Sequence, residues 1–201
     1  GLDHPLRDAV LASQAQDWRA VAAGLLGEGP EGRPIFYQKH MTHHMVEGFG
    51  LDWAEDCVNA FLIREPAEVL ASYAVKRAQV TLADIGIERQ RELFEREADK
   101  LGAPPPVVRG ADVLANPEGM LRVLCKALSI PFRKEMLRWP AGRRASDGVW
   151  APAWYDAVER STGFAAPESE PRKPLPDRLR KIAEKAHPHY EALAKHRLKV
   201  S

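Results

Sequence analysis

Hydrophobic positions along the chain follow two patterns, helical spacing and short continuous runs. Apolar residues three and four positions apart predict helices, with the ranges 1–26, 66–80, 81–101, 117–128 and 176–198. Short apolar runs bounded by turn residues predict strands, at 35–41, 57–63 and 106–109. Strands that alternate with helices indicate an α/β layered fold with a parallel sheet.

Residues with special backbone roles set the expected ends of these elements. Pro66 suits the first turn of a helix, and Thr81-x-x-Asp84 has the spacing of a capping box. Gly102 suits a helix end, whereas Pro188 is expected to interrupt the last helix. Residues 140–168 read as irregular, and a polar linker follows at 168–176. We therefore divide the chain into a domain at 1–167 and a linker with a helical tail at 168–201.

Composition limits the kind of partner. The 201 residues are 45% hydrophobic, which suits one compact domain with a tail. The 29 Lys and Arg nearly balance the 28 Asp and Glu, so we expect no general binding to nucleic acid or to a membrane surface. No apolar stretch approaches the ~20 residues that would span a bilayer. We expect a cytoplasmic protein with a small-molecule partner, and a homodimer is left open.

The segment FLIREPAEVLASY (61–73) combines a strand end with a helix start. Ligands of parallel sheets bind beyond the carboxyl ends of the strands, where Arg64 would lie. The start of the next helix favours an anion, and an arginine offers a planar fork to phosphate oxygens. Ser72 could add a hydroxyl donor. Alternatively, Arg64 forms an ordinary ion pair with Glu65 or Glu68, and Ser72 is a tolerated helix residue.

A cluster of basic side chains follows the predicted strand at 35–41. It consists of Lys39, His40, His43 and His44. A histidine can act as a general base near neutral pH, and a lysine can neutralise charge on a transferred group. His40 and His44 are four apart, but no cysteine or carboxylate pattern completes a zinc site. A solvated polar loop is the plain alternative.

The segment RRASDGVW (143–150) joins basic, flexible and aromatic residues. Its candidates are Arg143, Arg144, Gly148 and Trp150. A loop with this content could close over a nucleotide, pairing with phosphate and stacking on the base. Alternatively, the aromatic residues only pin the loop to the core.

Together these segments resemble the sulfotransferase family that uses 3′-phosphoadenosine 5′-phosphosulfate (PAPS). FLIREPAEVLASY resembles the family's 3′-phosphate-binding segment, which would give that role to Arg64 and Ser72. RGADVLANPEGMLRVLCKALSIPF (109–132) resembles a later stretch, with Ser129 in place of the usual glycine. RRASDGVW resembles the loop that caps the cofactor. The K-x-M-x-H-H segment is similar to bacterial sulfotransferase-like proteins.

The resemblance implies a helix-rich, P-loop-type three-layer α/β fold with a short parallel sheet. The family's first strand and phosphate loop are missing from this chain. The implied activity is sulfuryl transfer from PAPS, as co-substrate without a metal, to a hydroxyl or amine acceptor. Because Met41 occupies the register of the usual K-x-H histidine, the choice of base stays between His43 and His44, with His40 third.

Two other functions are compatible with parts of the sequence. A small-molecule kinase, as another P-loop transferase, would need a Mg²⁺-binding acid and a GK[ST] loop, and neither is visible in the sequence. A non-catalytic sulfotransferase-like binding domain could use the helix at 176–198 for docking. That helix could equally pack against its own domain.

Overall fold

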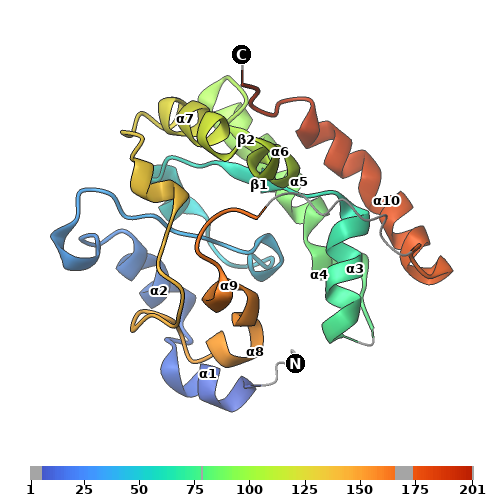
Figure 1. Cartoon of the computed structure of the whole chain (residues 1–201), viewed down its shortest axis with the longest axis horizontal. Helices are drawn as coiled ribbons and strands as arrows, with labels where there is room; N and C mark the ends of the chain where they lie inside the picture. The colour runs from blue at the N-terminus through green and yellow to red at the C-terminus, as the bar shows by residue number, and fades with distance from the viewer. Residues whose placement is uncertain (1–5, 78, 166–173, 201) are drawn as a thin grey trace. The chain divides into compact units, whose positions relative to one another are not determined.

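The computed structural model describes residues 6–77, 79–165 and 174–200 (Figure 1). The predicted linker at 168–176 lies mostly outside these residues. The chain forms two compact units. The first unit comprises Gly1–Gln38, Gly50–Asp56 and Arg133–Ala165, and the second unit comprises Lys39–Phe49, Cys57–Phe132 and Ala166–Ser201.

The first unit is built from short helices. They are α1 (Arg7–Ser13), α2 (Trp18–Leu25), η1 (Pro30–Gly32), η3 (Asp52–Asp56), η4 (Lys134–Leu137), α8 (Ala151–Trp154) and α9 (Asp156–Arg160). The prediction that 140–168 is irregular therefore misses two short helices, α8 and α9. The only regular pairing described inside this unit is an antiparallel bridge between Arg138 and Gly163.

Two predictions for the N-terminal part are wrong. The expected helix at 1–26 is divided into α1 and α2, because Gln14 is extended and Asp17 caps a new helix by accepting the Arg19 N–H at 3.1 Å. The expected strand at 35–41 is absent, and these residues have no regular structure. Ile35 and Tyr37 are exposed, so packing of these side chains does not stabilise a strand here.

The second unit contains the sheet. Strand β1 (Phe61–Ile63) pairs in parallel with β2 (Val107–Arg109), with Ile63 opposite Arg109. The helices are α3 (Pro66–Lys76), α4 (Leu82–Ile85), α5 (Ile87–Leu101), α6 (Gly110–Ala115), α7 (Pro117–Ala127), α10 (Asp177–Ala194) and the 3₁₀ helix η2 (Thr42–His44). This helix-rich unit with a short parallel sheet confirms the α/β prediction, with both strands shorter than expected.

The segment predicted as one helix at 81–101 is two helices. Thr81 and Asp84 form the expected capping box at the start of α4. Gly86 then adopts the left-handed conformation, with φ 64°, and ends α4. The chain turns there and continues as α5, which ends at Gly102 as predicted. Gly86 therefore joins two helices where a continuous one was expected.

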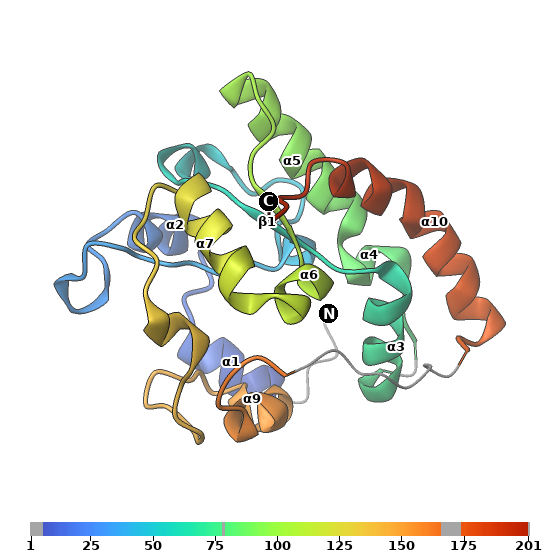
Figure 2. The same ribbon diagram turned by 45° about the horizontal axis from the view of Figure 1, so that its top comes forward.

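Helix α10 packs on the second unit, along α5 and α3 (Figures 1 and 2). Its buried residues join a core cluster with Ile63, Phe94 and Val107, and Leu179 joins a second cluster with Leu70. The alternative in which this helix packs against its own domain is therefore confirmed. None of the helices within the described ranges is both long and apolar enough to cross a membrane.

The expected interruption at Pro188 does not occur. Proline costs a helix about 3 kcal/mol because it removes one backbone hydrogen bond and crowds the preceding turn. Pro188 lies on the exposed side of α10, however, between the buried residues Ala186 and Tyr190. Burial on both sides of the proline outweighs the lost bond, so the helix continues.

Candidate functional site

The carboxyl edge of the sheet carries an arginine after β1, as predicted. Arg64 directly follows Ile63, and α3 begins two residues later at Pro66. The Arg64 Nε atom lies 3.1 Å from the Glu68 Oε2 atom, and the arginine side chain is 49% exposed. The structure thus contains the ion pair that the plain alternative expected, in a place that an anion could reach.

Ser72 lies on the same side of α3 as Glu68. Residues four apart are neighbours on a helix surface, so Glu68 and Ser72 follow one another along α3, which begins after Arg64. Ser72 is exposed. Glu68, the ion-pair partner of Arg64, precedes Ser72 by four residues in α3. The phosphate-binding role of Arg64 and Ser72 stays a prediction.

Residues 39–45, called the histidine segment below, are hydrogen-bonded to Gly86 and Arg89, at the junction of α4 and α5. The Thr42 hydroxyl in η2 donates a hydrogen bond of 2.9 Å to the carbonyl of Gly86. Three residues beyond Thr42, the Met45 carbonyl accepts 2.8 Å from the Arg89 Nε atom. Each of these bonds joins residues 44 apart in the sequence. Tertiary contacts on both sides of His43 and His44 therefore hold the segment in place.

A groove of about 520 Å³ lies beside this segment. It is lined by Thr42, His43, Met45, Val46, Glu47, Leu82, Ala83, Gly86, Glu88, Arg89 and Glu92. Of the four predicted catalytic residues, His43 alone belongs to this lining. The His43 and His44 rings are in edge-to-face contact with centroids 4.2 Å apart, and Lys39 is exposed. The groove therefore singles out one histidine of the three.

The surroundings of His43 favour its neutral form. Its pKa is lowered to about 4, chiefly by burial. The charges of His44 and Arg77 act in the same direction, while the carboxylate of Asp84 partly opposes them. Burial also lowers the pKa of His40. Near neutral pH, His43 thus presents an unprotonated imidazole to the groove, as a proton acceptor must.

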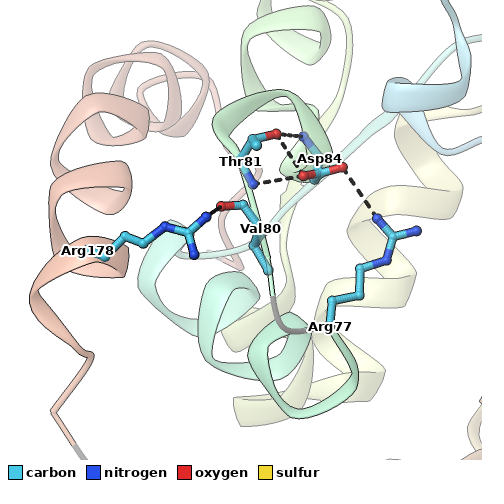
Figure 3. Close-up of polar contacts among 5 residues, drawn as sticks. All are labelled: Arg77, Val80, Thr81, Asp84 and Arg178. Carbon is cyan, nitrogen blue, oxygen red and sulfur yellow. Dashed lines mark hydrogen bonds and ion pairs between the residues drawn. The ribbon is translucent and has the colours of Figure 1, made fainter. Parts of the chain in front are cut away.

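A polar network of Arg77, Thr81 and Asp84, whose charges act on His43, joins the end of α3 to α4 (Figure 3). The backbone N–H and the hydroxyl of Thr81 each donate 2.7 Å to Asp84, and an Arg77 Nη1 atom lies 3.3 Å from the same carboxylate. Burial alone would raise the pKa of Asp84, but the bonds from Thr81 and the charge of Arg77 outweigh it and lower the pKa. Asp84 therefore stays ionised.

Sequence reasoning did not give this network a role near the site. The capping-box spacing identified Thr81 and Asp84 as helix-start residues only. Arg77, at the end of α3, carries no local signal, because its partner Asp84 lies in the next helix, seven residues later. Directly before Thr81, the Val80 carbonyl accepts a hydrogen bond of 3.3 Å from Arg178 of α10 (Figure 3).

The predicted cofactor loop belongs to the first unit. The Arg144 N–H donates 2.8 Å to the Asp147 carboxylate, and the Asp147 N–H donates 3.0 Å to the Arg144 carbonyl, so these two residues shape its turn. Trp150 donates 3.3 Å to the Tyr155 hydroxyl, and its ring covers Gly148, where an added Cβ would come within 2.3 Å of the ring. Arg143 and Arg144 are exposed. The loop is thus shaped by its own residues, and its cofactor role stays a prediction.

Within the described part of the chain, no three His, Cys, Asp or Glu side chains come close enough to share a metal ion.

A family model described as a sulfotransferase domain matches residues 1–197. The chain belongs to the sulfotransferase domain family. This family generally uses PAPS as its sulfate donor, and membership supports a transferase that moves sulfuryl groups. It also confirms the family resemblance drawn from the three motifs.

Two similar proteins come from Arabidopsis thaliana. Branched-chain-amino-acid aminotransferase-like protein 1 is 32% identical over 98% of this chain and 35% of its own length. Branched-chain-amino-acid aminotransferase-like protein 2 is 30% identical over 86% of this chain and 30% of its own length. The chain thus spans about a third of these relatives, whose names specify no sulfuryl acceptor. No solved structure matches the chain.

Proposed function

We propose that this chain takes part in sulfuryl transfer from PAPS to a hydroxyl or amine group of a small acceptor. The observation that carries the proposal is the position of His43. In a chain of the sulfotransferase family, a neutral imidazole lines a groove that is large enough for a small molecule. A neutral imidazole beside an acceptor's hydroxyl or amine can remove the proton that is lost on transfer.

The reaction moves one sulfuryl group and one proton. The acceptor oxygen or nitrogen forms a bond to the sulfur of PAPS, while the bond from sulfur to the bridging phosphate oxygen breaks. The products are the sulfated acceptor and 3′,5′-adenosine bisphosphate, and His43 takes the proton. The negative charge of PAPS raises the pKa of a nearby histidine, so His43 becomes a stronger base once PAPS is bound. Lys39 stabilises the charge on the leaving oxygen.

The 3′-phosphate binds to Arg64 and Ser72 in this proposal. Arg64 then exchanges Glu68 for the phosphate. The surface pair of Arg64 with Glu68 contributes about 0–1 kcal/mol. A phosphate carries more negative charge than a carboxylate and accepts from Ser72 as well, so it can replace Glu68 as the partner of Arg64. In this proposal the transfer uses no metal.

Titration with 3′,5′-adenosine bisphosphate tests the assignment. The protein is expressed from its complete gene, and binding is measured by calorimetry. Because Arg64→Ala removes charge-assisted bonds, affinity should fall about 10- to 100-fold. The matched control is Arg91→Ala, because Arg91 forms the same kind of exposed ion pair with Glu95, four residues later. Equal affinities of the two variants would overturn the phosphate assignment.

A further inference from the structure

Gly86 combines an unusual backbone conformation with a very close tertiary contact. Its φ of 64° lies in the left-handed region, which residues with a side chain rarely adopt. A Cβ placed on Gly86 would lie 2.7 Å from the Thr42 hydroxyl and 2.9 Å from the His43 backbone nitrogen. It would also lie 3.1 Å from the His43 Cβ. Any side chain at position 86 would therefore push against His43.

The contact between Gly86 and the histidine segment is also polar. The Thr42 hydroxyl donates to the Gly86 carbonyl at 2.9 Å, directly before His43 in the chain. Because Gly86 has no side chain, the histidine segment can pack directly against it. The hydrogen bond from the Thr42 hydroxyl then holds the segment in that contact. Since two of the three nearest atoms are the backbone nitrogen and the Cβ of His43, this contact determines where the imidazole begins.

The chain contains a natural comparison for Gly86. Gly102 ends α5 with φ 63°, nearly the same conformation as Gly86. No atom lies within 4 Å of a Cβ placed on Gly102. The two glycines thus share the conformational requirement and differ in tertiary contact. The same substitution, made at each position in a separate variant, distinguishes the effect of the contact with His43 from the effect of backbone strain.

We propose that Gly86 and Thr42 are positioning residues, which hold the His43 imidazole at the groove. The catalytic meaning of this position rests on the proposed function, but the position itself can be measured without activity. The groups that act on the His43 charge are His44 beside it, Arg77 after α3 and Asp84 in α4. The charged residues that line the same groove are Glu47, Glu88, Arg89 and Glu92.

The first experiment compares Gly86→Ala with Gly102→Ala by an NMR titration of His43. Both variants carry similar strain of about 1–2 kcal/mol. In the wild type and in Gly102→Ala, His43 should titrate with a pKa of about 4. In Gly86→Ala the displaced imidazole should be more hydrated, so its pKa should rise by about one unit or more toward the ordinary value of about 6.5. Identical His43 titrations in the two variants would overturn the proposal.

The second experiment measures sulfuryl transfer by the same proteins. A shift of about 1 Å in a catalytic group can cost about 100-fold in rate. Gly86→Ala should therefore lower kcat about 10- to 100-fold, with the KM for PAPS within about threefold of the wild type. Gly102→Ala should keep its kcat. A loss of kcat that is equal in both variants would indicate strain alone and overturn the proposal.

Thr42 provides a test that does not depend on the folding of Gly86→Ala. Thr42→Val keeps the shape and removes the donor, so it should lower kcat and raise the pKa of His43, while Thr42→Ser should restore both. Failure of serine to restore them would overturn the role of the hydroxyl. If the wild type transfers no sulfuryl group while the His43 titrations still separate the variants, the proposed function fails and the positioning contact stands.

Discussion

The histidine segment and Arg64, the proposed anchor of the 3′-phosphate, both belong to the second unit, but they are held in different ways. His43 is fixed by contacts with Gly86 and by the hydrogen bond from Thr42 to Gly86, which joins residues 44 apart. Arg64 is held by one ion pair with Glu68, in the adjoining helix, and is about half exposed. A base must be oriented before the reaction, whereas an anchoring charge can exchange one anionic partner for another.

The largest expected effect concerns the support behind His43. Asp84→Asn removes the charge that Thr81 and Arg77 stabilise. The free energy of unfolding should fall by about 1–2 kcal/mol at about pH 7, as for loss of a helix cap. Because Asp84 raises the pKa of His43, that pKa should fall further in the variant. This result would confirm that the network acts on the histidine and not only on the helix start.

The pH dependence of the Asp84 effect follows from its lowered pKa. The carboxylate contributes stability above the unfolded pKa of about 3.9 and loses it as the pH falls through the lower folded pKa. Urea unfolding should therefore show a large difference between the wild type and Asp84→Asn at neutral pH and a smaller one below about pH 3. The exposed Asp99 provides the control, since Asp99→Asn should change stability by less than about 0.5 kcal/mol. A difference that does not depend on pH would contradict this account.

A smaller effect is expected on the anchor side. Ser72→Ala should weaken binding of 3′,5′-adenosine bisphosphate about 3- to 10-fold, because the bond of an exposed neutral hydroxyl, which contributes about 0.5–1.5 kcal/mol, is lost. Stability should not fall, since Ser72 is exposed on a helix and alanine favours helix. Calorimetry on Ser72→Thr, which keeps a hydroxyl, provides the comparison. Unchanged affinity in Ser72→Ala would remove this residue from the site.

The smallest effect should come from the partner of Arg64. Glu68→Gln keeps the shape of the side chain and removes the charge that competes with a bound phosphate. Affinity for 3′,5′-adenosine bisphosphate should rise about two- to fivefold, in line with a surface pair of at most about 1 kcal/mol. Glu95→Gln, in the matched pair with Arg91, should leave affinity unchanged. Weaker binding in Glu68→Gln would instead show that Glu68 orients Arg64 for the ligand.

Local patterns predicted those parts of the fold that depend on neighbouring residues. The proline at the start of α3 and the capping box of α4 both lie where the sequence placed them. Asn116 caps α7 through an equally local contact, because its side chain accepts the Gly119 N–H at 3.0 Å. Each of these features needs only a few adjacent residues, so one sequence is sufficient to recognise it.

Features that depend on distant contacts were mispredicted. The sequence gives no sign that a strand at 35–41 would lack a partner, or that burial on both sides would carry α10 through Pro188. In the candidate site, the motif supplied the histidines, but the choice of His43 came from its groove. The role of Gly86 follows from its contact with Thr42, which is remote in the sequence. The role of Arg77 follows from its ion pair with Asp84 in the next helix. The spacing of apolar residues predicts neither contact.

Helix α10 has a consequence for the order of folding during synthesis. Its side chains complete both core clusters of the second unit, and beyond it the Leu198 N–H donates 2.8 Å to the Val107 carbonyl of β2. Before residues 177–198 leave the ribosome, the apolar faces of β1, β2 and α5 lack this cover. A nascent chain that ends before α10 therefore exposes hydrophobic surface. Chaperones that recognise exposed hydrophobic surface should bind it until α10 docks.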